Sequence, residues 1–395
     1  EANQHKNGIL FIDEINCASE TLAPTMLQFL QNKTFGTHRV PEGWIIVGAG
    51  NPPEYNKSVK EFDIVTMDRV KKIDVEPDHK VWKEYAYLRQ MHNAIITFVD
   101  AFPKNFYFAE TQVDGLKIVT PRGWEDLSYI IKMYEDLQLS IDKELVLQYV
   151  QNPKVATDFL NYYNLFVKYR KTYDINKIIH GTYSLSEYSS MKSMRVDEKM
   201  AIEGMLIEHL SGRFASYDNQ RNITKRLFHI LKNYKREVQA TSKPLSKFHD
   251  DFFESARNDL SDKSKKVERE ERQEILGTIH ELNGVADTLK RINPKDSGEA
   301  FTVVKDHFDK RVADLSKTGE QLNDALTNVF EFIVNVFGEG SELIVLITEL
   351  TINPYSVHFL TEHRNDAYFK YNKNILVGEK SAEIIKDIEA LNLNA

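Results

Sequence analysis

An apolar run that ends in two adjacent carboxylates is the feature that most limits the folds open to this chain. Residues 8–12 read Gly-Ile-Leu-Phe-Ile, and Asp13 and Glu14 follow directly. A short, wholly apolar run of this kind predicts a strand that is buried on both faces of a parallel sheet. Ligands of open α/β sheets bind at the carboxyl ends of such strands. We therefore predict that Asp13 and Glu14 lie at the edge of a ligand site.

A second apolar run has the same arrangement. Residues 44–47 read Trp-Ile-Ile-Val, small residues occupy positions 48–50, and Asn51 comes next. A helical pattern lies between the two runs, so we predict two strands of one sheet joined by a helix. Glu14 would then polarise a water molecule and Asn51 would orient that water, while Asp13 would hold a Mg²⁺ ion.

Two arginines complete a series of polar residues. Arg69 follows Thr-Met-Asp at positions 66–68, and Arg122 follows Thr-Pro at the start of a predicted helix. The order of these residues resembles that in the AAA+ ATPases, and most closely the MoxR-type and dynein-related branch. In that family the Walker B, sensor 1, arginine-finger and sensor 2 motifs come in this order. The resemblance covers roughly residues 8–130.

The resemblance implies a role for each of these residues. Asp13 corresponds to the Walker B acid that binds Mg²⁺ indirectly, and Glu14 to the catalytic glutamate. Asn51 corresponds to sensor 1, which serves both catalysis and nucleotide binding. Arg69 corresponds to the arginine finger, which acts on a nucleotide held by the neighbouring subunit of a ring. Arg122 corresponds to sensor 2, which contacts the nucleotide from the lid.

The sequence contains no phosphate-binding loop in the expected place. A Walker A motif needs Gly-x-x-x-x-Gly-Lys-Ser/Thr between a strand and a helix. Only twelve residues precede Asp13, and Gly8 is the single glycine among them. Residues 378–381 read Gly-Glu-Lys-Ser, and we interpret them as a loop because a glutamate separates the glycine from the lysine. We expect a fragment that begins just before its Walker B strand and is inactive by itself.

The pattern of apolar residues predicts three regions. The resemblance implies that residues 1–73 are a partial AAA+ α/β core, the remnant of a P-loop NTPase domain, and that residues 74–240 are the family's helical lid with an extension. Residues 241–395 are expected to form a C-terminal helical bundle. In the last region, apolar residues recur at three- and four-residue spacing between glycines and prolines, as in antiparallel helices that share a core. The expected fold is thus α/β at first and mainly α afterwards.

Composition restricts the partners. The net charge is −8 and the basic clusters are interleaved with acids, so we expect no nucleic acid. The most apolar region, residues 326–352, contains Glu331, Asn335 and a glycine-rich turn, so we expect no membrane span and a cytoplasmic protein.

The resemblance implies an ATPase that uses ATP and Mg²⁺, assembles into a ring and remodels or chaperones a protein client. Family members often act beside von Willebrand factor A-type proteins, so such a client is implied here. The alternative is a helical interaction or scaffold protein with a degenerate ATPase half. An intact Gly-Lys-Ser/Thr loop upstream of Glu1 would favour the ATPase.

Overall fold

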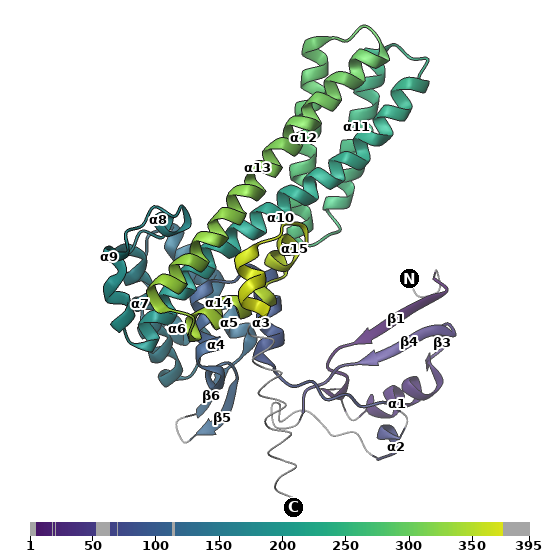
Figure 1. The fold of residues 1–395 in the computed structure, drawn as a ribbon. Coiled ribbons are helices and arrows are strands. Elements are labelled where there is room, and N and C mark those ends of the chain that lie inside the picture. Colours follow the sequence, from purple (N-terminus) through teal and green to yellow (C-terminus); the bar gives the residue numbers. More distant parts are fainter. Residues whose placement is uncertain are drawn as a thin grey trace, which may run out of the picture. The chain divides into compact units, whose positions relative to one another are not determined.

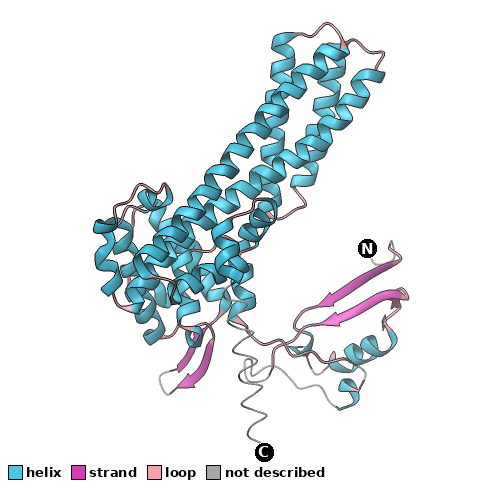
Figure 2. Ribbon diagram, viewed as in Figure 1, coloured by secondary structure: helices cyan, strands magenta, loops and turns pink. Residues whose placement is uncertain are grey.

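The computed structural model describes residues 5–373, except residues 18, 20, 53–63, 69 and 113–114. The chain divides into two compact units, Glu1–Glu76 and Pro77–Ala395. Most of the described chain is helical and its strands are short (Figure 2). The prediction of a mainly helical protein is therefore confirmed, whereas these elements do not establish an AAA+ core.

The first unit contains two parallel strands joined by a helix. Strand β1 (Asn7–Ile12) pairs with strand β4 (Gly43–Gly48), and the register places Ile12 opposite Gly48. A parallel pair needs a crossover connection, and helix α1 (Ala23–Asn32) lies within it, with a proline in its first turn. The remaining elements are a 3₁₀ turn (Ile15–Cys17), the short antiparallel strands β2 (Thr34–Phe35) and β3 (His38–Arg39), and helix α2 (Ile64–Met67).

The expectation that these strands are buried on both faces is wrong. Along β1 and β4, exposed side chains largely alternate with half-buried ones. Ile9, Phe11 and Ile45 are 66%, 60% and 63% exposed. Successive side chains of a strand point to opposite faces, so one face of this pair is packed and the other is open. A wholly apolar sequence does not distinguish that arrangement from burial on both faces.

The second unit begins with two helices that are separated by a short break. Helices α3 (His79–Leu88) and α4 (Asn93–Ala101) are separated at Gln90, whose φ of 50° is left-handed. His92 then caps α4, because its Nδ1 accepts the N–H of Ala94 at 3.2 Å. The left-handed residue and the helix cap thus end one helix and start the next, although apolar residues keep the same helical spacing across the break.

A hairpin and a series of capped helices follow. Thr120 precedes helix α5, and its hydroxyl accepts the N–H of Gly123 at 3.0 Å. The proline after Thr120 occupies the first turn, as predicted. The elements of this region are a 3₁₀ turn (Pro103–Asn105), strands β5 (Phe108–Gln112) and β6 (Gly115–Val119), helices α5 (Pro121–Asp136), α6 (Lys143–Tyr149), α7 (Pro153–Thr172), α8 (Ile175–Ile179) and α9 (Leu185–Tyr188), a second 3₁₀ turn (Ser189–Ser193), and helix α10 (Val196–Ala240).

Long helices dominate the rest of the chain. The charged run 262–274 contains the end of one helix, a connection and the start of the next. Gly319, expected to separate two helices, lies inside a single helix, where a Cβ would come within 2.9 Å of the His363 ring. The helices of this region include α11 (Leu245–Ser264), α12 (Arg269–Ile292), α13 (Ser297–Phe337), α14 (Ser341–Ile352) and α15 (Pro354–Glu362).

The second unit has two hydrophobic cores. The first includes Trp124, Phe159 and Phe330, which are fully buried. The second lies among α10, α11, α12 and α13 and includes Tyr234 and Leu282. Figure 1 shows α10 and α13 running side by side from the globular part into the bundle. Both helices contribute to both cores, so the expected division at residue 240 falls inside one compact unit.

A buried ionic network connects α3, α4 and α14. The ammonium group of Lys83 lies 2.9 Å from Asp100 Oδ1 and also pairs with Glu349, which accepts a hydrogen bond from the Tyr87 hydroxyl. The side chains of Lys83 and Glu349 are each 3% exposed. Burial raises the pKa of the Glu349 carboxyl, and the charge of Lys83 opposes that rise.

Within the described residues, no single helix is long and apolar enough to cross a bilayer. In that part of the chain, only α14 and α15 taken together have the necessary length and apolar composition. These two helices are bent by 87° relative to each other.

Candidate functional site

The carboxyl ends of β1 and β4 lie at one edge of the first unit. Beyond the last residue pair of the strands, the N–H of Ala49 donates to the carbonyl of Ile12, and the N–H of Ile15 donates to the carbonyl of Ala49, both at 2.9 Å. This pairing holds the segment after β1 against the segment after β4. The structure therefore brings Asp13, Glu14 and Asn51 to the same edge, as the sequence predicts.

Asp13 and Glu14 form an exposed turn at the end of β1. The carboxylate of Asp13 accepts the N–H of Glu14 at 3.0 Å. Glu14 has a φ of 50°, in the left-handed region that residues with a side chain rarely occupy. Its carbonyl accepts the N–H of Cys17 at 2.8 Å, which starts the 3₁₀ turn. Uncommon backbone conformations of this kind are concentrated at functional sites.

Asn16 is a site residue that the sequence analysis missed. Its Nδ2 donates to the backbone carbonyl of Asn51 at 2.8 Å, which joins the two segments directly. A Cβ at Gly50 would lie 2.3 Å from Asn16 Oδ1, so glycine is needed for this close approach. Asn16 Oδ1 is buried and has no hydrogen-bond partner within the described part of the chain. The small residues at positions 48–50 were the available sequence signal that another segment, here Asn16, approaches this part of the backbone closely.

The two arginines are not brought to this edge by any described contact. Arg69 lies outside the described residues. Arg122 belongs to the second unit, where it is exposed at the second position of α5. The arginine-finger and sensor 2 roles of these residues remain predictions.

This edge presents the exposed carboxylates of Asp13 and Glu14 close to the amide groups of Asn16 and Asn51. Carboxylate oxygens can bind a hydrated cation and accept a proton from water, and an asparagine side chain can orient that water. Across the described residues, no group of three or more histidine, cysteine, aspartate or glutamate side chains is arranged to hold a metal ion. A Mg²⁺ ion bound here would therefore rely on one or two carboxylates and on its own waters.

Comparison with known proteins adds no relative. No protein-family model matches the chain, and neither a curated protein nor a solved structure is significantly similar to it.

Proposed function

We propose that residues 8–130 are the Walker B to sensor 2 part of an AAA+ ATPase of the MoxR type. ATP hydrolysis would then drive the remodelling of a protein client. The ring assembly, the client and its von Willebrand factor A-type character come from the family resemblance alone.

One observation carries this proposal. Two parallel, hydrogen-bonded strands place an Asp-Glu pair and an asparagine at a common edge, with the glutamate in an uncommon backbone conformation. Phosphoryl transfer to water needs few protein groups beyond those that position the nucleotide, the metal and the water. The edge formed by Asp13, Glu14 and Asn51 offers such groups in a compact arrangement.

The side chains at this edge fit a magnesium ion bound with its substrate. Mg²⁺ keeps several waters in proteins and is commonly held by one or two carboxylates together with substrate phosphates. Asp13 would hold the ion through water, and Glu14 would accept a proton from the attacking water, with Asn51 orienting it. When bound, the ion would neutralise charge on the phosphates.

Replacement of Glu14 by glutamine tests this assignment. The experiment uses a form of the protein that carries a phosphate loop ahead of residue 1. Because the amide cannot act as a general base, Glu14→Gln should keep nucleotide binding but lower the rate of ATP hydrolysis by about 10² or more. Turnover is measured by phosphate release, and binding by a fluorescent nucleotide.

The matched control is Glu42→Gln, which removes the same charge from an exposed residue just before β4. This variant should hydrolyse ATP at the normal rate. Unchanged hydrolysis in Glu14→Gln would remove Glu14 from the mechanism. If the coding sequence upstream of Glu1 has no Gly-Lys-Ser/Thr loop, the alternative of a helical scaffold with a degenerate ATPase half is favoured instead.

A further inference from the structure

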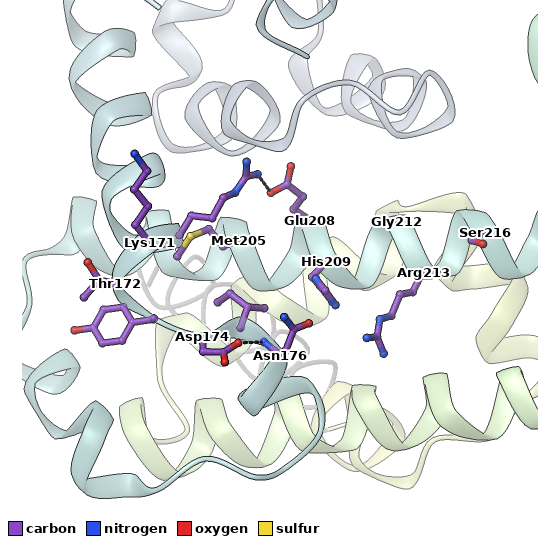
Figure 3. A pocket seen from close by; sticks show the side chains of 13 residues that line it. Lys171, Thr172, Asp174, Asn176, Met205, Glu208, His209, Gly212, Arg213 and Ser216 are labelled. Atoms are coloured by element: carbon purple, nitrogen blue, oxygen red, sulfur yellow. Dashed lines mark hydrogen bonds and ion pairs between the residues drawn. The ribbon is translucent and has the colours of Figure 1, made fainter. Parts of the chain in front are cut away.

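A cavity of about 850 Å³ lies against one face of α10 in the second unit. The turn between α7 and α8 forms the opposite wall. In Figure 3, Arg213 and His209 extend from α10 on the side where Asn176 of α8 lies. The volume falls in the range of sites that bind small organic molecules, roughly 300–1,000 Å³.

Arg213 is a cation without a counter-charge in this cavity. Its guanidinium has no ion pair or hydrogen bond with any residue in the described part of the chain. By contrast, Arg170, which also lines the cavity, pairs with Glu208 and lies 3.3 Å from Glu135. Burial lowers the pKa of the Arg213 guanidinium, so this group has lost part of its hydration without gaining a partner. A bound anion would supply that partner through charge-assisted hydrogen bonds.

His209 provides a second unsatisfied group. Its Nε2 is buried and has no hydrogen-bond partner among the residues that the structure describes. Burial lowers the pKa of the His209 imidazole, and the charges of Arg213 and His180 lower it further, against an opposite effect of Glu208. The ring is therefore neutral at pH 7 and can donate one N–H. His209 lines the cavity, and a turn of its ring would bring this nitrogen to a ligand oxygen, which would remove the desolvation cost of the unpaired group.

The acidic side chains that line the cavity already have partners. Glu208 pairs with Arg170. Asp174 is the N-terminal cap of α8, and its carboxylate accepts the N–H of Asn176 at 3.0 Å. Lys171 is also part of the lining, but it extends away from Arg213 in Figure 3. On the side of α10 that carries His209, the uncompensated positive charge of the cavity is therefore that of Arg213.

We propose that this cavity binds a small organic phosphate ester, whose phosphate is held by Arg213, His209 and Asn176. Three separate donor side chains suit a dianion with three terminal oxygens better than a carboxylate with two. The cavity is much larger than a phosphate group, and Ile175 and Met205 offer apolar wall for the organic part. This site contains none of the residues assigned to ATP hydrolysis and does not depend on that assignment.

Binding of inorganic phosphate and of phenyl phosphate to the full chain tests the proposal. Calorimetric titrations are run at constant ionic strength, because surface charge alone binds anions in a salt-dependent way. Both anions should bind saturably, and phenyl phosphate more tightly. Arg213→Gln should weaken both by about tenfold or more, the effect of losing a hydrogen bond to a charged group. Arg236→Gln removes the same charge from an exposed position on α10 and should leave binding unchanged.

The ionisation of His209 gives a readout that a structural role of Arg213 would not produce. A phosphate dianion favours imidazolium, so phosphate should raise the pKa of His209 in NMR titrations of ¹³C-labelled histidine. The spectrum of His209→Gln identifies the signal. If Arg213→Gln does not fold, Arg213→Lys keeps the charge without the planar fork and should show a smaller loss of affinity.

Four results would overturn the proposal. They are the absence of saturable phosphate binding, equal weakening by Arg236→Gln, an unmoved His209 pKa, and acetate binding as tight as that of phosphate.

Discussion

Glu203 is a carboxyl group that the folded chain keeps protonated. It lies on α10, is 4% exposed, and its Oε1 has no hydrogen-bond partner within the described residues. Burial raises the pKa of Glu203 to about 9; the carboxylates of Glu342 and Glu349 raise it and Lys199 opposes them. The side chain is therefore neutral in the folded protein at pH 7, although it ionises in the unfolded chain near its ordinary value of 4.5.

This shift predicts how the stability of the protein depends on pH. The folded state retains a proton that the unfolded state releases, so the contribution of Glu203 is fully present below pH 4.5 and is lost as the pH rises toward about 9. Glu203→Gln has nearly the same shape and cannot ionise. Relative to the wild type, the variant should gain stability as the pH is raised from 5 to 9, as measured by urea unfolding.

The control for this prediction is Glu331→Gln, at an exposed position on α13. Its unfolding free energy should follow the wild-type pH profile. A Glu203→Gln profile that runs parallel to the wild-type profile would show that Glu203 is ionised in the folded protein.

At the scale of elements, the ionic network of Lys83 fixes α3, α4 and α14 to one another. Lys83 lies between the carboxylates of Asp100 and Glu349, and two of these three side chains are almost fully buried. Buried ion pairs add little net stability compared with apolar contacts, but a charge left without its partner is costly. The network therefore constrains which helices pack together more than it strengthens their packing.

Lys83→Met should destabilise the protein by about 3–5 kcal/mol, because it leaves Glu349 buried without its cation. The double variant Lys83→Met with Glu349→Leu should recover most of that loss. Thermal and urea unfolding measure both effects. Lys265→Met breaks an exposed ion pair with Asp262 and should leave stability nearly unchanged. A double variant no more stable than the single one would contradict this account.

The second core predicts a fragment that folds by itself. This core lies between residues 227 and 304 and is built from the end of α10, from α11 and α12, and from the start of α13. A fragment of residues 219–318 contains all four segments and should unfold cooperatively, with helical circular dichroism. Residues 245–395 lack α10, against which α12 and α13 pack, and should melt without cooperativity. Cooperative melting of residues 245–395 would contradict this reading.

The sequence predicted where helices form better than it predicted which helices pack against one another. Apolar spacing identified the buried faces of α12 and α13, because that spacing depends on local periodicity. It did not show that α10 and α13 pair over long stretches, since pairing depends on side chains far apart in the chain. Gly319 indicated a break locally, but packing against His363 explains it within a helix.

The candidate site was predictable to a similar degree. Parallel strands bring their carboxyl ends to one edge, so Asp13, Glu14 and Asn51 could be placed together from strand order alone. The hydrogen bond from Asn16 to the backbone of Asn51 depends on the exact register of β1 and β4. No local pattern specifies that register.

At the scale of the whole molecule, the two proposed sites make different predictions about nucleotides. Residues 1–395 contain no Gly-x-x-x-x-Gly-Lys-Ser/Thr sequence. The backbone N–H groups and the lysine of that loop provide most of the affinity for phosphate in P-loop ATPases, and these residues do not supply them. This chain should not bind Mg-ATP with micromolar affinity. Weaker binding, measured with a fluorescent nucleotide, should be lost in Arg213→Gln and unchanged in Asp13→Asn. Micromolar binding that Asp13→Asn alters would contradict this expectation.

Helix α10 runs without interruption through both cores of the second unit. Its 45 residues correspond to a length of about 68 Å at the usual rise per residue. Arg213, which lines the cavity, lies 27 residues before Ala240 at the end of α10, or about 40 Å along the helix, so a tilt of about 5° at Arg213 would displace Ala240 by about 3.5 Å. Repacking of a few degrees beside the cavity of Arg213 would thus move the far end of α10 by a few ångströms, against the resistance of α13, which packs along α10.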